Sequence, residues 1–277
     1  MIPGPAADLL QVLQALLNEG RYQEILDRFA SADDADARAP TVLLTVAATA
    51  TRLGRLDQGS ALASRALATC RLRADSEGRV RAENLLGAIA FARGEVGQAA
   101  GHWRAAIEFG RAAGDTLTVA RASNNLASAL HLGGDVLEAR TLYRESLAGY
   151  QRLADRREIA GILTNLALTY RWAGDAPTAA RLGEDAVRHA EVVGDPTLLA
   201  LVFAGRAETM LDTGEFAVAE RLLDRSEQLA SSAGDEVGVG EVYRIRAERS
   251  LRLGEPKAAL TAAAAGMALA ERGGQPL

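Results

Sequence analysis

Apolar residues recur along the chain at spacings of three and four positions, separated by polar residues. In one representative stretch, the apolar positions that keep this spacing are Leu126, Ala127, Leu130, Ala139, Tyr143 and Leu147. Side chains at i, i+3 and i+4 lie on one face of an α-helix, so the pattern predicts amphipathic helices that each bury one stripe. The same pattern stands 40 residues earlier and 40 residues later, which indicates a repeat.

Glycines interrupt the helical pattern at a regular interval. Gly54, Gly94, Gly134, Gly174, Gly214 and Gly254 follow one another 40 residues apart, and Gly20 precedes the first of them by 34. A second series lies half a repeat away and reads Ala74-Asp75, Gly114-Asp115, Ala154-Asp155, Gly194-Asp195 and Gly234-Asp235. Gly suits the left-handed position after a helix, and Asp caps the free N–H groups of the next helix. The sequence therefore predicts a repeated helical hairpin, with two helices of about four turns each.

Small residues recur at two places in this hairpin. The first series is Gly87, Ala127, Ala167, Ala207 and Ala247, and the second is Ala99, Ala139, Ala179, Ala219 and Ala259. A position that is small in every copy predicts a close helix crossing, where a larger side chain would cost about 1–3 kcal/mol. Trp103 and Tyr143 occupy the large position of the repeat, so we expect both in the core.

The repeat resembles a known family. Leu86-Gly87 followed by Gly94, Ala99, Trp103 and Ala106 is similar to the tetratricopeptide repeat signature. Asn124-Asn125-Leu126-Ala127 and Thr164-Asn165-Leu166-Ala167 resemble the longer repeats, of about 40 residues, found in kinesin light chains and in bacterial transcriptional activators and signalling ATPases.

The resemblance extends from about Ala6 to Arg272. It implies an all-α fold, a right-handed superhelical solenoid of seven helix-turn-helix repeats that forms a single domain over residues 6–273. Arg206 and Arg246 depart from the family pattern because they replace the usual Leu, and the first repeat is shorter and degenerate.

A stack of such hairpins lines a concave groove with its first helices, and a groove of this kind suits an extended peptide or a partner helix. The predicted contact residues lie opposite the buried stripe of these helices: Arg81, Asn84, Arg121, Asn124, Asn125, Ser128, His131, Thr164, Asn165, Arg171, Trp172, Glu208, Arg244 and Glu248. Resemblance to the family implies that Asn125 and Asn165 pair with a partner's backbone amide, since Asn both donates and accepts. The alternative is that these two residues tie adjacent helices together.

Charge on the predicted groove changes along the array. Arg81 and Arg121 share a repeat position and could engage a partner's carboxylate, or else remain solvated or pair with neighbours such as Glu83. Towards the C-terminus the same face becomes acidic, and this gradient would fix the direction of a bound chain. Trp172 is the one aromatic residue that we consider as a groove anchor.

Composition and motifs argue against other function classes. A net charge of −5 and a pI near 5.4 disfavour a nucleic-acid partner. His102, His131 and His189 stand in different repeats with no ligands at metal-binding spacing, and the lone Cys70 fits a small buried hydrophobe. No catalytic, metal or cofactor motif survives, nor any secretion signal or membrane span, so we expect a cytoplasmic protein that is not an enzyme.

The last predicted helix, residues 256–270, is almost wholly apolar apart from Lys257 and Thr261. A terminal repeat normally presents a polar outer face. Either a further repeat covers this helix, or a second copy packs against it as a dimer.

The sequence thus predicts a scaffold that binds a protein or peptide through its groove. The alternative function is a regulatory sensor module, such as the repeat array of a bacterial transcriptional activator or signalling ATPase, which binds an effector or controls an attached domain.

Overall fold

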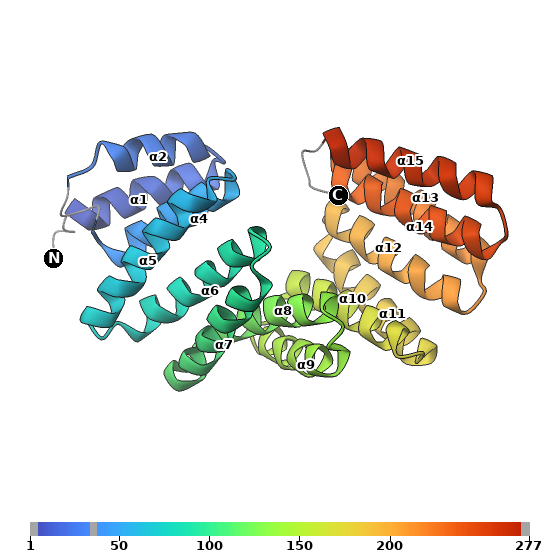
Figure 1. The fold of residues 1–277 in the computed structure, drawn as a ribbon, viewed down its shortest axis with the longest axis horizontal. Coiled ribbons are helices and arrows are strands. Elements are labelled where there is room, and N and C mark those ends of the chain that lie inside the picture. The colour runs from blue at the N-terminus through green and yellow to red at the C-terminus, as the bar shows by residue number, and fades with distance from the viewer. Residues whose placement is uncertain (1–4, 34–37, 273–277) are drawn as a thin grey trace. The chain divides into compact units, whose positions relative to one another are not determined.

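A computed structural model describes residues 5–33 and 38–272 of the chain, and every regular element in these ranges is an α-helix. The helices follow one another in seven pairs, as the sequence predicts (Figure 1). The pairs are α1 (Pro5–Asn18) and α2 (Tyr22–Ala30), α4 (Pro40–Arg52) and α5 (Leu56–Leu72), α6 (Ser76–Ala92) and α7 (Val96–Ala113), α8 (Thr116–Leu132) and α9 (Val136–Arg152), α10 (Arg156–Trp172) and α11 (Ala176–Val193), α12 (Pro196–Asp212) and α13 (Phe216–Ser232), and α14 (Glu236–Arg252) and α15 (Pro256–Arg272).

The structure divides into two compact units, residues 1–133 and residues 134–277. In the first unit, α6 packs against α4, α5, α7 and α8. In the second, α12 packs against α10, α11, α13 and α14. Within each unit the first helices of successive pairs contact one another and form one layer, while the second helices cover its other side. This layer, which we call the first-helix layer, carries the predicted contact residues. The single domain over residues 6–273 stays a prediction.

The predicted turns are present. The glycines of the 40-residue series adopt left-handed φ angles, from 73° at Gly54 to 87° at Gly134. Ala74 and Ala154 take the same conformation in the second series, with φ of 52° and 55°. For a residue with a Cβ atom this conformation costs about 1 kcal/mol.

The predicted aspartate caps are also confirmed. The side chain of Asp195 accepts a hydrogen bond from the backbone N–H of Leu198 at 2.8 Å. The equivalent carboxylates cap their helices in the same way, namely Asp75, Asp115, Asp155 and Asp235. The bond from Leu198, followed by the charge and hydrogen bond of Arg157, holds the pKa of Asp195 below its usual value. These caps explain why α6, α8, α10, α12 and α14 begin where the sequence places them.

The small positions lie at close helix contacts. Ala127, Ala167 and Ala207 are buried, as are four of the second series at zero exposure, Ala99, Ala139, Ala179 and Ala219. At Gly87 a Cβ atom would lie 2.5 Å from Nε1 of Trp103, so the indole fills the space left by the missing side chain. Trp103 and Tyr143 are each 2% exposed, which confirms both as core residues.

Three polar or reactive residues inside the helical pattern find a structural role. Arg246, which replaces Leu, forms ion pairs with three carboxylates of the preceding α13, at 3.0 Å to Glu220, 2.7 Å to Asp224 and 2.6 Å to Glu227. Arg206 similarly reaches Glu184 of α11 at 3.4 Å. Cys70 is buried, as expected, and burial, reinforced by nearby Asp75, raises the pKa of its thiol to about 11.

Candidate functional site on the first-helix layer

In the first unit, α6 and α8 bring two equivalent sets of predicted residues onto one surface. Arg81 and Asn84 lie on α6, and Arg121 and Asn124 stand 40 residues later on the adjacent α8. Both arginines are exposed, and both asparagines are half-buried beside them. We call these four residues the Arg–Asn surface.

The two asparagines of this surface share an uncommon feature. The amide oxygens Oδ1 of Asn84 and of Asn124 are buried and have no hydrogen-bond partner among the residues that the structure describes. A buried acceptor without a donor costs about 1–3 kcal/mol, so such groups are usually paired. Neither amide oxygen would give up an internal hydrogen bond if its side chain turned outward to meet a partner.

Two carboxylates of α6, Glu77 and Glu83, stand near Arg81 in the sequence, and both are paired. Arg81 lies 3.5 Å from the exposed carboxylate of Glu77. Arg81 thus pairs with a neighbouring carboxylate, but this is Glu77 and not Glu83, which is buried and lies 3.2 Å from Arg71 and 2.8 Å from Nδ1 of His102. Burial alone would raise the pKa of Glu83, but His102 and then Arg71 hold it below its usual value.

The remaining predicted residues of the first unit lie at the C-terminal half of α8. Asn125, Ser128 and His131 are half-buried, and the hydroxyl of Ser128 donates to the backbone carbonyl of Asn124 at 3.0 Å. Burial lowers the pKa of His131, so its imidazole is mainly uncharged near neutral pH. Asn125 and Asn165 fall in different units, so their joint action stays a prediction.

In the second unit the predicted residues converge on a network of ion pairs. Arg171 of α10 reaches Asp212 of α12 at 2.6 Å, Glu208 of α12 at 3.4 Å and Glu248 of α14 at 2.6 Å. Its side chain is only 11% exposed. Three successive first helices are therefore joined through one guanidinium group.

Two further arginines complete this network. Arg244 contacts Glu208 and pairs with Glu241 at 2.6 Å. Arg252 lies 2.7 Å from Asp212 and 2.7 Å from Glu248. We call the seven residues the charge cluster: Arg171, Glu208, Asp212, Glu241, Arg244, Glu248 and Arg252.

The charge cluster changes the interpretation of the acidic end of the groove. With all groups ionised, the three arginines and four carboxylates of the charge cluster carry a net charge of −1, so the arginines neutralise most of the negative charge of the carboxylates. Burial raises the pKa of Glu208, although Arg244 and Arg171 oppose that shift. Sequence reasoning placed Arg171, Glu208, Arg244 and Glu248 on this face but did not foresee that they bind one another.

Three other predicted residues of the second unit differ in accessibility. The prediction that Thr164 faces a partner is wrong, because its side chain is 4% exposed and its hydroxyl donates to the carbonyl of Ala160. Thr164 packs where Gly205 leaves room, since a Cβ at Gly205 would lie 2.6 Å from the Thr164 methyl carbon. Trp172, at the end of α10, is 66% exposed, and Asn165 is half-buried.

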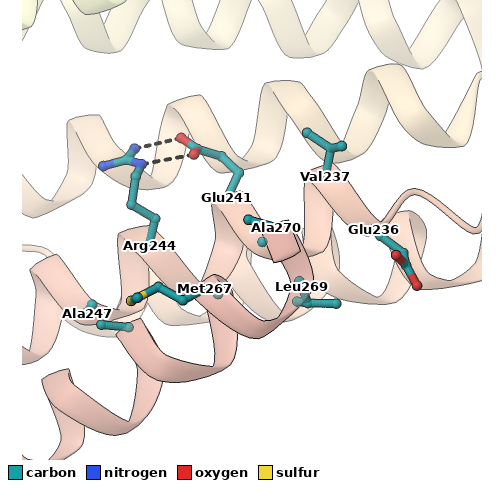
Figure 2. Close-up of a pocket in the computed structure, with 11 residues that line it drawn as sticks. Glu236, Val237, Glu241, Arg244, Ala247, Met267, Leu269 and Ala270 are labelled. Atoms are coloured by element: carbon teal, nitrogen blue, oxygen red, sulfur yellow. Dashed lines mark hydrogen bonds and ion pairs between the residues drawn. The ribbon is translucent and has the colours of Figure 1, made fainter. Parts of the chain in front are cut away.

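An apolar cavity of about 380 Å³ lies between α14 and α15. Figure 2 shows Met267 projecting from α15 towards Ala247, with the paired Arg244 and Glu241 on α14 above them. The helices come close here because Gly240 and Gly266 lack side chains. The sequence signal for this cavity was the run of alanines in the last helix.

No group of three or more His, Cys, Asp or Glu side chains in the described ranges could hold a metal ion. Among the helices that the structure describes, none combines the length and apolar character needed to cross a membrane.

Residues 118–191 match the tetratricopeptide repeat family model, and no curated protein matches the chain by sequence. The apo form of RapI is similar over 96% of this chain and 97% of its own, with 10% identity and a TM-score of 0.81. A Rap protein complexed with Competence and Sporulation Factor is similar over 98% of this chain and 77% of its own, with 16% identity and a TM-score of 0.74. Kinesin light chain repeats of Podosopora anserina are similar over 69% of this chain and 94% of their own, with 16% identity and a TM-score of 0.57. The fold is thus an array of tetratricopeptide-type repeats.

Proposed function

We propose that this array of tetratricopeptide-type repeats is a scaffold without catalytic activity, and that its Arg–Asn surface binds an extended segment of a partner protein. The observation that carries the proposal is the pair of equivalent asparagines, Asn84 and Asn124, whose amide oxygens have no hydrogen-bond partner in the described part of the chain. A side-chain amide offers a donor and an acceptor in the geometry of a peptide group, so two of them at one repeat spacing suit an extended backbone.

The two arginines define the chemistry of the preferred partner. Arg81 and Arg121 are both exposed, each three residues before its asparagine, and Arg81 lies 3.5 Å from the carboxylate of Glu77. Guanidinium groups bind carboxylates in a bidentate manner. The partner segment therefore carries Asp or Glu side chains, and its affinity falls as salt screens the charges.

The charge cluster of the second unit has a different role. Its side chains already bind one another, so a ligand there would have to break ion pairs that include the largely buried Arg171 and Glu208. Removing one partner from a buried pair costs about 3–5 kcal/mol. The cluster holds α10, α12 and α14 together rather than taking the partner segment.

The similar structures support a binding function in general terms. One of them is a Rap protein complexed with Competence and Sporulation Factor, so an array of this fold accommodates another molecule. The two proteins share only 16% sequence identity. The binding surface of the present chain is therefore inferred from its own residues.

Capture from native lysate tests the proposal. The wild type is compared with the Asn84→Ala/Asn124→Ala variant, and with Arg181→Ala/Arg221→Ala, which removes two exposed charges from the second helices. We expect a partner that the wild type and the Arg variant retain and the Asn variant loses, with all three equally helical by circular dichroism. Equal capture by the Asn variant would place binding elsewhere.

The cavity between α14 and α15 favours a second candidate function, that of a sensor for a small effector. Its volume of about 380 Å³ lies within the range of small-molecule sites. A ligand that binds there would raise the melting temperature of the wild type, and Ala263→Leu, which enlarges a side chain that lines the cavity, would abolish the shift.

A further inference from the structure

We propose that two copies of this chain associate through α15, packed antiparallel against the partner's α15 about a twofold axis at Ala264. The proposal concerns a surface separate from the Arg–Asn surface, so it stands or falls independently of the proposed function.

The outward face of α15 differs from that of α11 and α13, the two second helices that precede it. On α13 the exposed outward positions are occupied by Arg221, Asp224 and Gln228. The equivalent exposed positions 40 residues later are Thr261, Ala264 and Ala268. On α11 the same three positions again carry charges, Arg181, Glu184 and Arg188. A face that is charged on two helices has therefore become almost uncharged on the third.

The exposed residues of α15 form a seam with coiled-coil spacing. Lys257, Leu260, Ala264, Met267 and Glu271 follow at intervals of three, four, three and four residues, and all five are exposed. Leu260 is 72% exposed and Met267 is 49% exposed. Alternating spacings of three and four are the pattern by which two helices pack knobs into holes.

An antiparallel arrangement about Ala264 makes this seam complementary to itself. Leu260 then meets the partner's Ala268, so this large side chain faces a small one, and Met267, half-exposed at the edge of the cavity beside Ala247, lies next to the partner's Thr261. Lys257 meets the partner's Glu271, which gives an ion pair at each end. A parallel arrangement would instead oppose Lys257 with the partner's Lys257 and Glu271 with the partner's Glu271.

The end charges of α15 point to the same occupant. Lys257 lies in the first turn of the helix and Glu271 in the last. Each is placed against the helix dipole, which favours acidic residues at the N-terminus and basic residues at the C-terminus. An antiparallel second copy would bring a carboxylate to each Lys257 and an ammonium group to each Glu271.

The first test is the oligomeric state. Sedimentation velocity from low micromolar to several hundred micromolar protein should show a concentration-dependent dimer for the wild type. Ala264→Glu, which restores the residue type of Glu184 on α11, should raise the dimer dissociation constant at least tenfold. Gln228→Glu adds the same charge at an exposed position of α13 and should change it less than twofold. A wild type that stays monomeric, or a dimer that Ala264→Glu leaves intact, overturns the proposal.

A charge swap tests the antiparallel orientation. Lys257→Glu and Glu271→Lys should each weaken the dimer about fivefold, and the double variant should return to within twofold of the wild type. Each single change also places a charge favourably on the helix dipole, so the melting temperature of the dilute monomer should rise slightly while dimerisation falls. If Lys257 and Glu271 affected only the folding of α15, the melting temperature of the monomer and the strength of dimerisation would rise or fall together.

Cross-linking provides a second readout of the axis. Ala264→Cys should form a disulfide-linked dimer under mild oxidation, whereas Asp224→Cys, at the equivalent position of α13, should not. Cys70 is buried and does not compete. Equal cross-linking at both positions, or single charge swaps that leave the dimer unchanged, would refute the pairing about Ala264.

Discussion

Replacing Gly87 by Ala tests how the repeats pack. A Cβ at this position would lie 2.5 Å from Nε1 and 2.6 Å from Cδ1 of Trp103. The indole cannot easily move aside, because it is 2% exposed and its N–H donates to the backbone carbonyl of Asn84 at 3.3 Å. Overpacking costs about 1–3 kcal/mol, and the better helix propensity of Ala returns about 0.5–1 kcal/mol. We expect a net loss of about 1–2 kcal/mol.

Gly101→Ala is the matched control for this change. Gly101 lies inside α7, on the same hairpin, and a Cβ there would meet no atom within 4 Å. The substitution should therefore stabilise the protein by about 0.5–1 kcal/mol through helix propensity alone. Urea unfolding followed by circular dichroism measures both variants. If Gly87→Ala were as stable as Gly101→Ala, the account of the small positions as steric requirements would be refuted.

Three further predictions concern turns, caps and pH. Ala154→Gly should stabilise the protein by up to about 1 kcal/mol in thermal unfolding, because Ala154 holds a φ of 55°. Asp195→Ala should destabilise the protein by about 1 kcal/mol in urea unfolding, since the cap on the N–H of Leu198 is lost. The difference in the free energy of unfolding between this variant and the wild type should shrink in acid, as Asp195 protonates in the native state. Burial lowers the pKa of His131 below 6.5, so the unfolded chain binds more protons than the native protein. The free energy of unfolding should therefore fall as the pH drops below about 6.5, and His131→Gln should flatten that pH dependence.

Much of the fold could be predicted because its determinants are local. A left-handed Gly and a capping Asp act within a few residues, so their 40-residue spacing in the sequence determines where helices begin and end. The small positions could be predicted for a similar reason, because each helix crossing recurs with the same 40-residue period. The burial of Cys70 and Trp103 could be predicted from the same apolar stripe of the helices.

The candidate site was less predictable because its contacts join different helices. Arg171 binds Asp212 and Glu248, which are 41 and 77 residues away in the chain, and only the packing of α10, α12 and α14 makes these pairs. Helical periodicity likewise could not show that Thr164 fills the space beside Gly205. The unpaired amide oxygens of Asn84 and Asn124 depend on the packing around each side chain, which the sequence pattern does not specify.

The two units therefore differ in how their polar residues are used. In the second unit the residues of the charge cluster pair with one another, with Arg171 at the centre. In the first unit two amide oxygens remain unpaired beside exposed arginines. Binding that adds hydrogen bonds without breaking internal ones is favoured in the first unit for this reason.

The central claim is that Asn84 and Asn124 bind the backbone of a partner segment. The most direct measurement is calorimetric titration of the captured partner's segment, as a synthetic peptide, into wild type and into Asn84→Ala/Asn124→Ala. Each lost hydrogen bond weakens binding by about 0.5–1.5 kcal/mol, so the account predicts a dissociation constant raised about tenfold or more. An unchanged dissociation constant, with both proteins folded, would contradict it.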